Sequence, residues 1–213
     1  MSEAKNKNML KRVLMTFFGV LFLGTAVGFM NYSSFGMDPF QVFAHGLGLH
    51  MPFSYGTSYV IISAIELVAI FIADKTKIGI GTFINLFLIG YVVDYSSMGI
   101  TYVFDKLGGG LIIKIVSLII GTVLLCFCAA IYFTADLGVS THDAVSLIIS
   151  EKQNKISFAA LRVINDVFCI VVGFLLGQAF GVGTIVSAFF TGPLVAFFRR
   201  TVAEPMLYGK KKD

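Results

Sequence analysis

Long apolar runs separated by short polar connections dominate the pattern of the chain. A membrane-crossing helix needs about 20 mostly apolar residues. Six stretches meet this requirement: residues 13–32, 54–73, 78–93 with an extension toward 104, 111–133, 156–177 and 180–198. The first run follows basic residues, as in a signal peptide, but it is too long for a signal-peptide core and no small-residue cleavage site follows it. The pattern therefore predicts six transmembrane helices, including a retained first one.

The composition supports an integral membrane protein and excludes several other classes. Hydrophobic residues make up 57% of the 213 residues and charged residues only 13%, against about 25% charged in soluble domains. This hydrophobicity also excludes an intrinsically disordered chain. The three cysteines, Cys126, Cys128 and Cys169, lie in apolar runs without a histidine at ligand spacing. We therefore expect neither a disulfide framework nor a metal site, and no cofactor.

The distribution of basic residues predicts the orientation of the chain in the membrane. Thirteen of the sixteen Lys and Arg residues fall in the termini and loops that would share the side of the N-terminus. Short cytoplasmic loops retain Lys and Arg, so both termini are predicted to be cytoplasmic, with a basic cytoplasmic tail at residues 202–213. The basic residues form short clusters between apolar runs instead of one continuous face, which argues against a nucleic-acid partner.

The chain contains an internal repeat. Displacing the sequence by 102 residues superposes a set of matching residues: Gly19 on Gly121, Gly36 on Gly138, Gly79 on Gly181, Gly81 on Gly183, Thr82 on Thr184, Phe87 on Phe189 and Gly90 on Gly192. The two copies cover about residues 11–104 and 111–201. Each copy holds three predicted crossings, an odd number, so the second copy must enter the membrane from the opposite side. The sequence thus predicts one all-α membrane domain built from two inverted-topology repeats.

A shorter segment lies between the first and second crossing of each copy, at residues 38–50 and 140–151. Asp38-Pro39 forms a helix start with an N-cap and a proline, and Ser140-Thr141 supplies hydroxyl caps. These short helices either re-enter the membrane, with their partly positive N-termini in the interior, or lie flat at the interface. Gly36 and Gly138 permit the tight turn that re-entry requires, which favours the first alternative.

Three ionisable residues fall within predicted crossings, where charges are costly and usually face the protein interior: Glu66, Arg162 and Asp166. Arg162 and Asp166 share a helix face at i, i+4 spacing. The helices that carry Glu66 and Arg162 are equivalent under the repeat, so we expect them to meet and form one buried charge cluster. Such a cluster either locks two helices together or uses its surplus carboxylate to couple proton binding to transport.

Polar residues at repeat-related positions form a second group of candidates. Asn85 is equivalent to Ser187 and Gln41 to Asp143, and His142 and Asn165 lie close by in the pattern. A symmetric set of hydrogen-bonding groups suits a small polar solute. Close backbone approach to that solute would be allowed by six glycines: Gly36, Gly79, Gly81, Gly138, Gly181 and Gly183. The alternative is interhelical hydrogen bonding, worth about 0.6 kcal/mol for each bond in a membrane.

These blocks also resemble a known family. The Gly36-Met-Asp-Pro-Phe-Gln block, the Gly79-Ile-Gly-Thr-Phe-Ile-Asn block and their counterparts at Gly138 and Gly181 are similar to the YczE/YyaS/YitT family of bacterial integral membrane proteins. The similarity runs from about residue 11 to residue 200, although Thr141 stands where the first copy has Pro39. The resemblance implies a multi-pass protein of the bacterial plasma membrane and a transporter of unknown substrate. It supplies no established site residues.

The sequence therefore predicts a transporter that moves a small polar or amphipathic solute by alternating access, either passively or coupled to protons. The alternative is a non-transporting membrane scaffold or regulator that binds a partner protein or lipid. An enzyme is not expected, because no nucleophile, base and orienting group occur together. The expected partners are the lipid bilayer and a small solute, with the chain as a monomer or homodimer. Helix dipoles favour anions whereas the acidic residues favour cations or zwitterions, so the sequence predicts no substrate charge.

Overall fold

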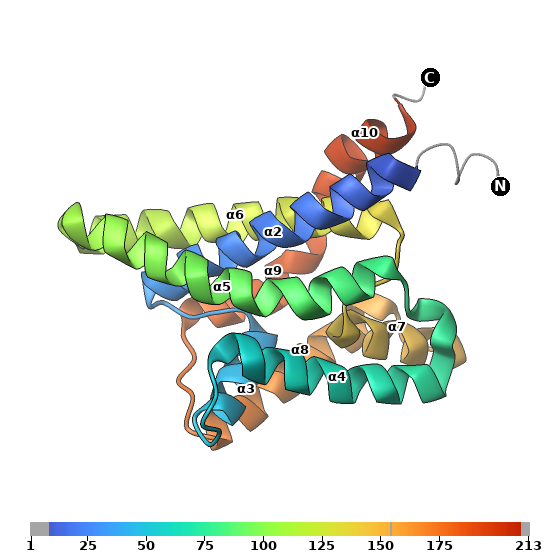
Figure 1. Ribbon diagram of the computed structural model, residues 1–213, viewed down its shortest axis with the longest axis horizontal. Coiled ribbons are helices and arrows are strands. Elements are labelled where there is room, and N and C mark those ends of the chain that lie inside the picture. Colours follow the sequence, from blue (N-terminus) through green and yellow to red (C-terminus); the bar gives the residue numbers. More distant parts are fainter. Residues whose placement is uncertain (1–8, 154, 210–213) are drawn as a thin grey trace.

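The computed structural model describes residues 9–153 and 155–209, and every regular element within these ranges is a helix (Figure 1). The all-α prediction is therefore confirmed for this part of the chain. Lys5, Lys7 and tail residues 210–213 lie outside the described residues. In chain order the elements are α2 (Met9–Ser33), α3 (Pro39–Gly48), α4 (Tyr55–Asp74), the 3-10 turn η1 (Lys75–Lys77), α5 (Ile80–Lys106), α6 (Leu111–Ala135), α7 (Thr141–Gln153), α8 (Phe158–Leu175), α9 (Val182–Phe198), the π-helical turn η2 (Arg199–Ala203) and α10 (Glu204–Tyr208).

Each apolar run and each short segment of the sequence coincides with one helix. Among the described residues, five helical stretches are long and apolar enough to cross a membrane: Met9–Ser33, Tyr55–Lys77, Ile80–Lys106, Leu111–Ala135 and Val182–Tyr208. The predicted extension of the third run is real, because α5 continues to Lys106. The predicted crossing at residues 156–177 corresponds to α8, which has 18 residues and is not among the five.

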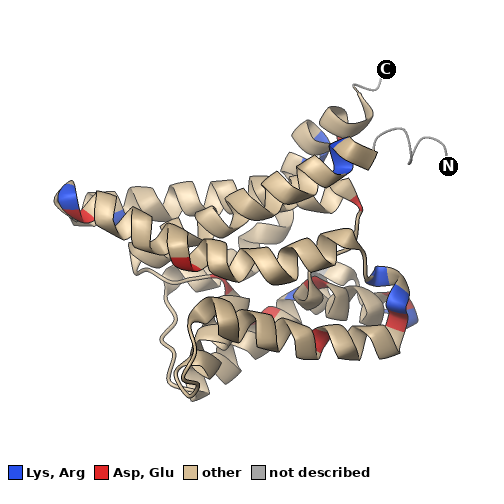
Figure 2. Cartoon of the chain, in the orientation of Figure 1, with Lys and Arg blue, Asp and Glu red and all other residues tan. Residues whose placement is uncertain are grey.

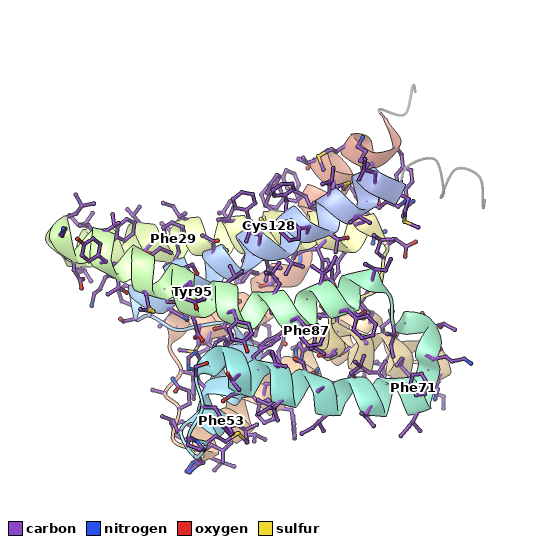
Figure 3. All side chains as sticks on the ribbon, in the orientation of Figure 1. Phe29, Phe53, Phe71, Phe87, Tyr95 and Cys128 are labelled. Atoms are coloured by element: carbon purple, nitrogen blue, oxygen red, sulfur yellow. The ribbon has the colours of Figure 1, made fainter. Side chains whose placement is uncertain are left out.

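Large apolar side chains cover much of the outer surface. Phe71, Phe87 and Tyr95, labelled in Figure 3, are 63%, 60% and 74% exposed. Soluble monomers rarely expose contiguous apolar patches of more than a few hundred Å². Exposed aromatic and aliphatic side chains also occur on α2, α4, α6, α8 and α9, so this surface is suited to lipid. The chain is a membrane protein.

The helices form two groups that share one interior. α2 packs along α6 and α5, and α6 also packs against α9. α3, α4, α7 and α8 form the second group, beside the first in Figure 1. Within the second group, each short helix, α3 or α7, contacts both α4 and α8. The largest buried cluster joins the two groups, because it includes Val20 and Met30 of α2, Tyr132 of α6, Phe40 of α3 and Tyr59 of α4.

Two reciprocal crossings tie the halves of the chain together. The amide of Gly81, at the start of α5, donates to the carbonyl of Leu137 at 2.7 Å. The amide of Gly183, at the start of α9, donates to the carbonyl of Phe35 at 2.8 Å. The loop of each half therefore lies across the helix start of the other half. A Cβ atom at Gly79 would overlap the Leu137 carbonyl, so only glycine allows this approach.

A threonine completes each crossing. Thr82 Oγ1 accepts from the Gly79 amide at 3.2 Å and donates to the Val139 carbonyl at 2.8 Å. At the other crossing, Thr184 Oγ1 accepts from the amide of Met37 at 3.1 Å. Each hydroxyl thus satisfies helix-terminal or loop amides that burial would otherwise leave unpaired. The loop glycines that meet these threonines, Gly36 and Gly138, have φ angles of +128° and +109°.

The first part of the predicted tail at residues 202–213 is a docked helix. α9 continues through η2 into α10, where Leu207 is only 3% exposed. The guanidinium of Arg12 donates to the Ala135 carbonyl at 2.8 Å and to the Tyr208 hydroxyl at 3.1 Å. Arg12 therefore joins the start of α2, the end of α6 and α10, because its several donors reach the orphan carbonyl at a helix end.

The crossings generate a first prediction. In Gly79→Ala and Gly181→Ala, the new Cβ atom meets a backbone carbonyl that cannot move aside. We expect each variant to lose on the order of 2 kcal/mol of stability, measured by thermal unfolding in detergent. Gly99→Ala is the matched control, because it lies within α5 with nothing within 4 Å of the new atom. Equal melting temperatures for Gly79→Ala and Gly99→Ala would contradict the crossing.

Candidate functional site

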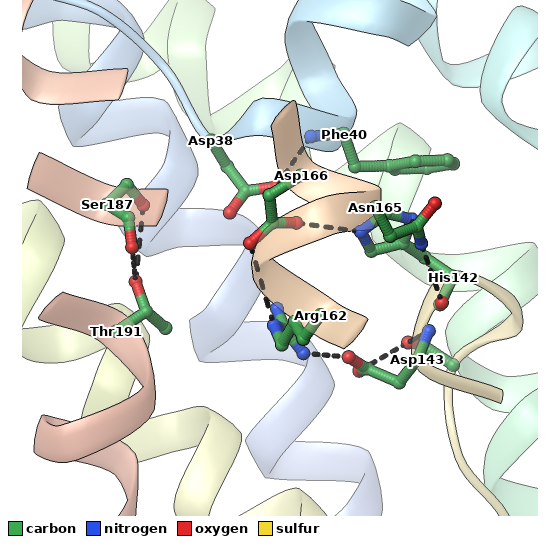
Figure 4. A network of polar contacts seen from close by, with 10 residues as sticks. Asp38, Phe40, His142, Asp143, Arg162, Asn165, Asp166, Ser187 and Thr191 are labelled. Atoms are coloured by element: carbon green, nitrogen blue, oxygen red, sulfur yellow. Dashed lines mark hydrogen bonds and ion pairs between the residues drawn. The ribbon is translucent and has the colours of Figure 1, made fainter. Parts of the chain in front are cut away.

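The candidate site lies where the first turns of α3 and α7 face α8 (Figure 4). Asp38 caps α3, its Oδ2 accepting from the Phe40 amide at 3.2 Å, and Pro39 follows at the first helical position. Ser140 Oγ accepts from the Asp143 amide at 3.2 Å and donates to Asp143 Oδ2 at 2.6 Å. Both helix starts are therefore capped by their own side chains, as the sequence predicts for Asp38 and Ser140.

Arg162 links two carboxylates of this site. It forms an ion pair with Asp143 at the start of α7, and its Nε lies 3.9 Å from Asp166 Oδ2 one turn along α8. The Asp143 and Asp166 side chains are 8% and 5% exposed, and that of Arg162 is 20% exposed. Buried ions of this kind persist only when each has an opposite charge and hydrogen bonds. The guanidinium therefore holds α7 against α8.

His142 occupies the other side of Asp166. Its Nε2 lies 3.0 Å from Asp166 Oδ1, and the Asn165 amide lies 3.1 Å from its Nδ1. Burial lowers the pKa of His142, but hydrogen bonds to Asp166 and Cys169 outweigh burial and raise it to about 10. At neutral pH the imidazole is therefore a cation. The Asn165 amide nitrogen also donates to the backbone carbonyl of His142 at 3.4 Å.

Glu66 contacts this site through a different residue from the one predicted. The sequence places Glu66 in one cluster with Arg162 and Asp166, on helices that meet. In the structure Arg162 and Asp166 do pair, whereas Glu66 Oε2 accepts from Thr141 Oγ1 at 2.6 Å. The reason is that α3 and α7 each pack against both α4 and α8 and occupy the space between them. The carboxylate of α4 therefore reaches the start of α7 instead of the guanidinium of α8.

The repeat-related polar residues are buried but mostly paired within the protein. Asn85 Oδ1 accepts from the Tyr59 hydroxyl at 3.1 Å. Ser187 Oγ lies 3.3 Å from Thr191 Oγ1. Gln41 is 4% exposed, and its Oε1 has no hydrogen-bond partner among the described residues. The structure thus brings Asp143, Asn165 and His142 together around α8, while Asn85 bonds Tyr59 of α4 and Ser187 bonds Thr191 of its own helix.

The six candidate glycines approach the chain's own backbone. Gly79 and Gly81 lie against Leu137 and Gly138, and Gly181 and Gly183 lie against Phe35 and Gly36. The close approach that the sequence assigns to a solute is occupied in this structure by a loop of the other repeat. These glycines therefore position the starts of α3 and α7, and through them the charged residues of the site.

Sequence reasoning treated Asp38 as a helix cap and as one of the acidic residues that favour cations, and it treated Cys169 only as an apolar residue. In the structure Asp38 interacts electrostatically with Asp166, Arg162 and His142, and Cys169 hydrogen-bonds His142. The aromatic ring of Phe40 lies 4.8 Å from the His142 ring. The Asp38-Pro39 pair, two residues after Gly36, was the sequence feature that could have indicated a role for Asp38 in the site. The position of Cys169 had no local signal, because it depends on how α7 packs on α8.

Comparisons with known proteins agree with a membrane protein of unestablished function. Residues 10–200 match a family described as a family of unknown function (DUF6198). An uncharacterized protein of Haemophilus influenzae is 27% identical over 193 residues, which cover 91% of this chain and 85% of the relative. The uncharacterized membrane protein YczE of Bacillus subtilis is 24% identical over 182 residues, or 85% and 82% of the two chains. No solved structure matches the chain.

The site generates a second prediction. Arg162→Gln removes the guanidinium that pairs with Asp143 and leaves that carboxylate without its cation, so we expect a loss of about 3 kcal/mol in thermal or denaturant unfolding. Arg162→Gln/Asp143→Asn, which removes both charges, should recover part of that loss. Arg200→Gln, at an exposed position, is the control and should change little. If the double variant is no more stable than Arg162→Gln, the pair does not hold α7 to α8.

Proposed function

The chain belongs to the DUF6198 family, and we propose that it is a transporter that moves a small polar or amphipathic solute, chemically unchanged, by alternating access at the α3–α7–α8 site. One observation carries this proposal. The first turns of two short helices, each from a different half of the chain, converge on a buried cluster of Asp143, Arg162, Asp166 and His142. Ionisable groups at such positions are costly in a membrane protein and commonly mark solute or proton pathways.

The contacts between the halves support an inverted-repeat architecture with six crossings. In this architecture α8 crosses the membrane in addition to the five long helices. Gly81 bonds the loop of the second half in the way that Gly183 bonds the loop of the first. The packing partners correspond in the same way, since α3 contacts α8 and α7 contacts α4. Inverted repeats place the binding site between the halves, near the middle of the membrane. In this arrangement α3 and α7 are re-entrant helices.

The placement of basic residues supports an N-in, C-in orientation. Figure 2 shows that charged residues of the α4–α5 turn and of the α7–α8 connection gather at the end of the molecule that carries both termini. The α5–α6 turn lies at the opposite end. An excess of Lys and Arg on one side marks the cytoplasmic face. The site then lies between the two membrane surfaces, with one short helix entering from each.

The geometry of the site favours one sign of charge on the solute, whereas the sequence alone favoured neither. The start of α3 is capped by Asp38, and Ser140 satisfies an amide at the start of α7. These side chains occupy helix termini that would otherwise attract an anion. Four carboxyl groups, those of Asp38, Glu66, Asp143 and Asp166, outnumber the two cationic groups of Arg162 and His142. A proton, a cation or the ammonium end of a zwitterion therefore suits the site better than a free anion.

The second candidate function is a non-transporting scaffold or regulator that binds a partner protein or lipid. It is favoured by the internal pairing of Asn85 with Tyr59 and of Ser187 with Thr191, which needs no solute. The rings of Phe40 and His142, whose centroids lie 4.8 Å apart, also fill part of the interior. Under this alternative the charge cluster only joins helices, and no small solute stabilises the protein.

Membrane topology is the first test of the proposal. Reporter fusions at residue 108, between α5 and α6, and at residue 153, at the end of α7, should lie in opposite compartments. Fusions after residue 209 should share the compartment of residue 153. An alkaline phosphatase and a fluorescent protein used in parallel give complementary signals for the two sides. If the fusions at residues 108 and 153 lie in the same compartment, the inverted arrangement is excluded.

Solute binding and flux are the second test. A thermal-shift screen of purified protein against small polar metabolites should identify a ligand, because binding to the folded state alone stabilises by about 2.7 kcal/mol at 100 times Kd. Uptake of that ligand into liposomes should depend on pH in the wild type. Glu66→Gln and Asp166→Asn should weaken this dependence, whereas Glu151→Gln, at an exposed acid, should retain it. Normal pH-dependent uptake in both site variants would exclude their role in proton coupling.

A further inference from the structure

Two carboxyl groups of the site, those of Asp38 and Glu66, have no ion-pair partner among the described residues, and Glu66 accepts a hydrogen bond from Thr141 instead. Asp38 Oδ2 accepts from the Phe40 amide at 3.2 Å, and its side chain lies beside Asp166 in Figure 4. Asp166 already uses Oδ1 for His142 and Oδ2 for Arg162. Arg162 in turn also pairs with Asp143. The two cations are thus engaged by two other carboxylates, and Asp38 is left facing a like charge.

The groups around Asp38 come from four helices. α8 contributes Asp166 and Arg162, and α7 contributes His142. The hydroxyls of Tyr55 and Tyr59 on α4 and the thiol of Cys126 on α6 also interact electrostatically with Asp38. Only Arg162 and His142 among these groups are cations. An ionised Asp38 would therefore add a second negative charge beside Asp166 in a poorly solvated interior, which is costly.

Opposing effects act on this carboxyl group. The backbone hydrogen bond from Phe40 and the positive end of α3 favour the ionised form. Burial, and then the charge of Asp166, act in the other direction and raise the pKa of Asp38, although Arg162 and His142 lower it. The direction that results is upward. The residue as a whole is half-buried.

We propose that Asp38 holds a proton in the resting protein and is the residue that binds and releases the coupling proton. The second part of this proposal rests on the proposed transport function, and the first part does not. Loss of the proton creates two adjacent carboxylates, one at the start of α3 and one on α8. Their repulsion favours separation of α3 from α8, and so links proton release to movement of a re-entrant helix.

Asp38→Asn tests the first part without any solute. Asparagine has the shape of the protonated carboxyl and caps a helix as well as aspartate does. A carboxyl group with a raised pKa in the folded state stabilises the protein at low pH, and this contribution is lost as pH rises toward the folded-state value. The wild type should therefore lose melting temperature between pH 5 and pH 8 relative to Asp38→Asn. The variant should melt higher by a few degrees at pH 8 and match the wild type near pH 5.

Matched variants and a second measurement keep the result interpretable. Asp38→Ala removes the cap and should melt lower at both pH values. Infrared spectra of the wild type at neutral pH should contain a protonated-carboxyl band that Asp38→Asn lacks. If the variant does not fold, the absence of any such band from the wild type still overturns the proposal. An Asp38→Asn melting temperature below that of the wild type at pH 8, or the absence of that band, would overturn the proposal.

Sodium is the ion that must be distinguished from the proton. If NaCl but not choline chloride stabilises the wild type at pH 8 and leaves Asp38→Asn unchanged, Asp38 binds sodium and the proton assignment is wrong. The coupling role is measured separately, by the pH dependence of uptake in Asp38→Asn liposomes. Retained pH dependence there would overturn the coupling role. If the protein transports no solute at all, the melting profiles still report whether Asp38 holds a proton. The proposed transport function and the protonation of Asp38 can therefore fail independently.

Discussion

The crossing between each loop and the helix start of the opposite half is the constraint on which the rest of this structure depends. Gly81 bonds Leu137, and Gly183 bonds Phe35, at 2.7 and 2.8 Å. A loop can lie this close to a helix only where no side chain intervenes, and at Gly79 and Gly181 an added Cβ atom would overlap the loop carbonyl. Because the crossings fix where the two loops end, they also fix where α3 and α7 begin. The charged residues of the site follow from that placement.

The charge cluster has a different physical basis. Its members are poorly solvated, so the energy of each depends on the others. Arg162 satisfies Asp143 and Asp166, and His142 satisfies Asp166 from the opposite side. Removal of Arg162 leaves Asp143 without its cation, and removal of Asp166 leaves His142 without its carboxylate.

The two halves of the chain differ in the chemistry of their corresponding residues. His142, Asp143 and Arg162 bring charge to the second half, whereas the corresponding region of the first half contains Phe40 and Tyr59, whose rings lie 5.4 Å apart. The first half nevertheless contributes two carboxyl groups to the site, those of Asp38 and Glu66.

The sequence by itself determined the helical class, the approximate limits of α2 to α9 and the membrane environment, because these follow from local hydrophobicity, which each segment carries wherever it packs. It did not predict α10, which lies in the segment expected to be a tail. The sequence also identified the glycines at 79 and 181 and the Arg162–Asp166 pair, which depend on spacing within one element. Only the tertiary structure decided that α3 and α7 lie between α4 and α8, that Glu66 bonds Thr141, and that Asp38 faces Asp166. These contacts join residues from separate helices, and no periodic pattern along the chain records which helices pack together.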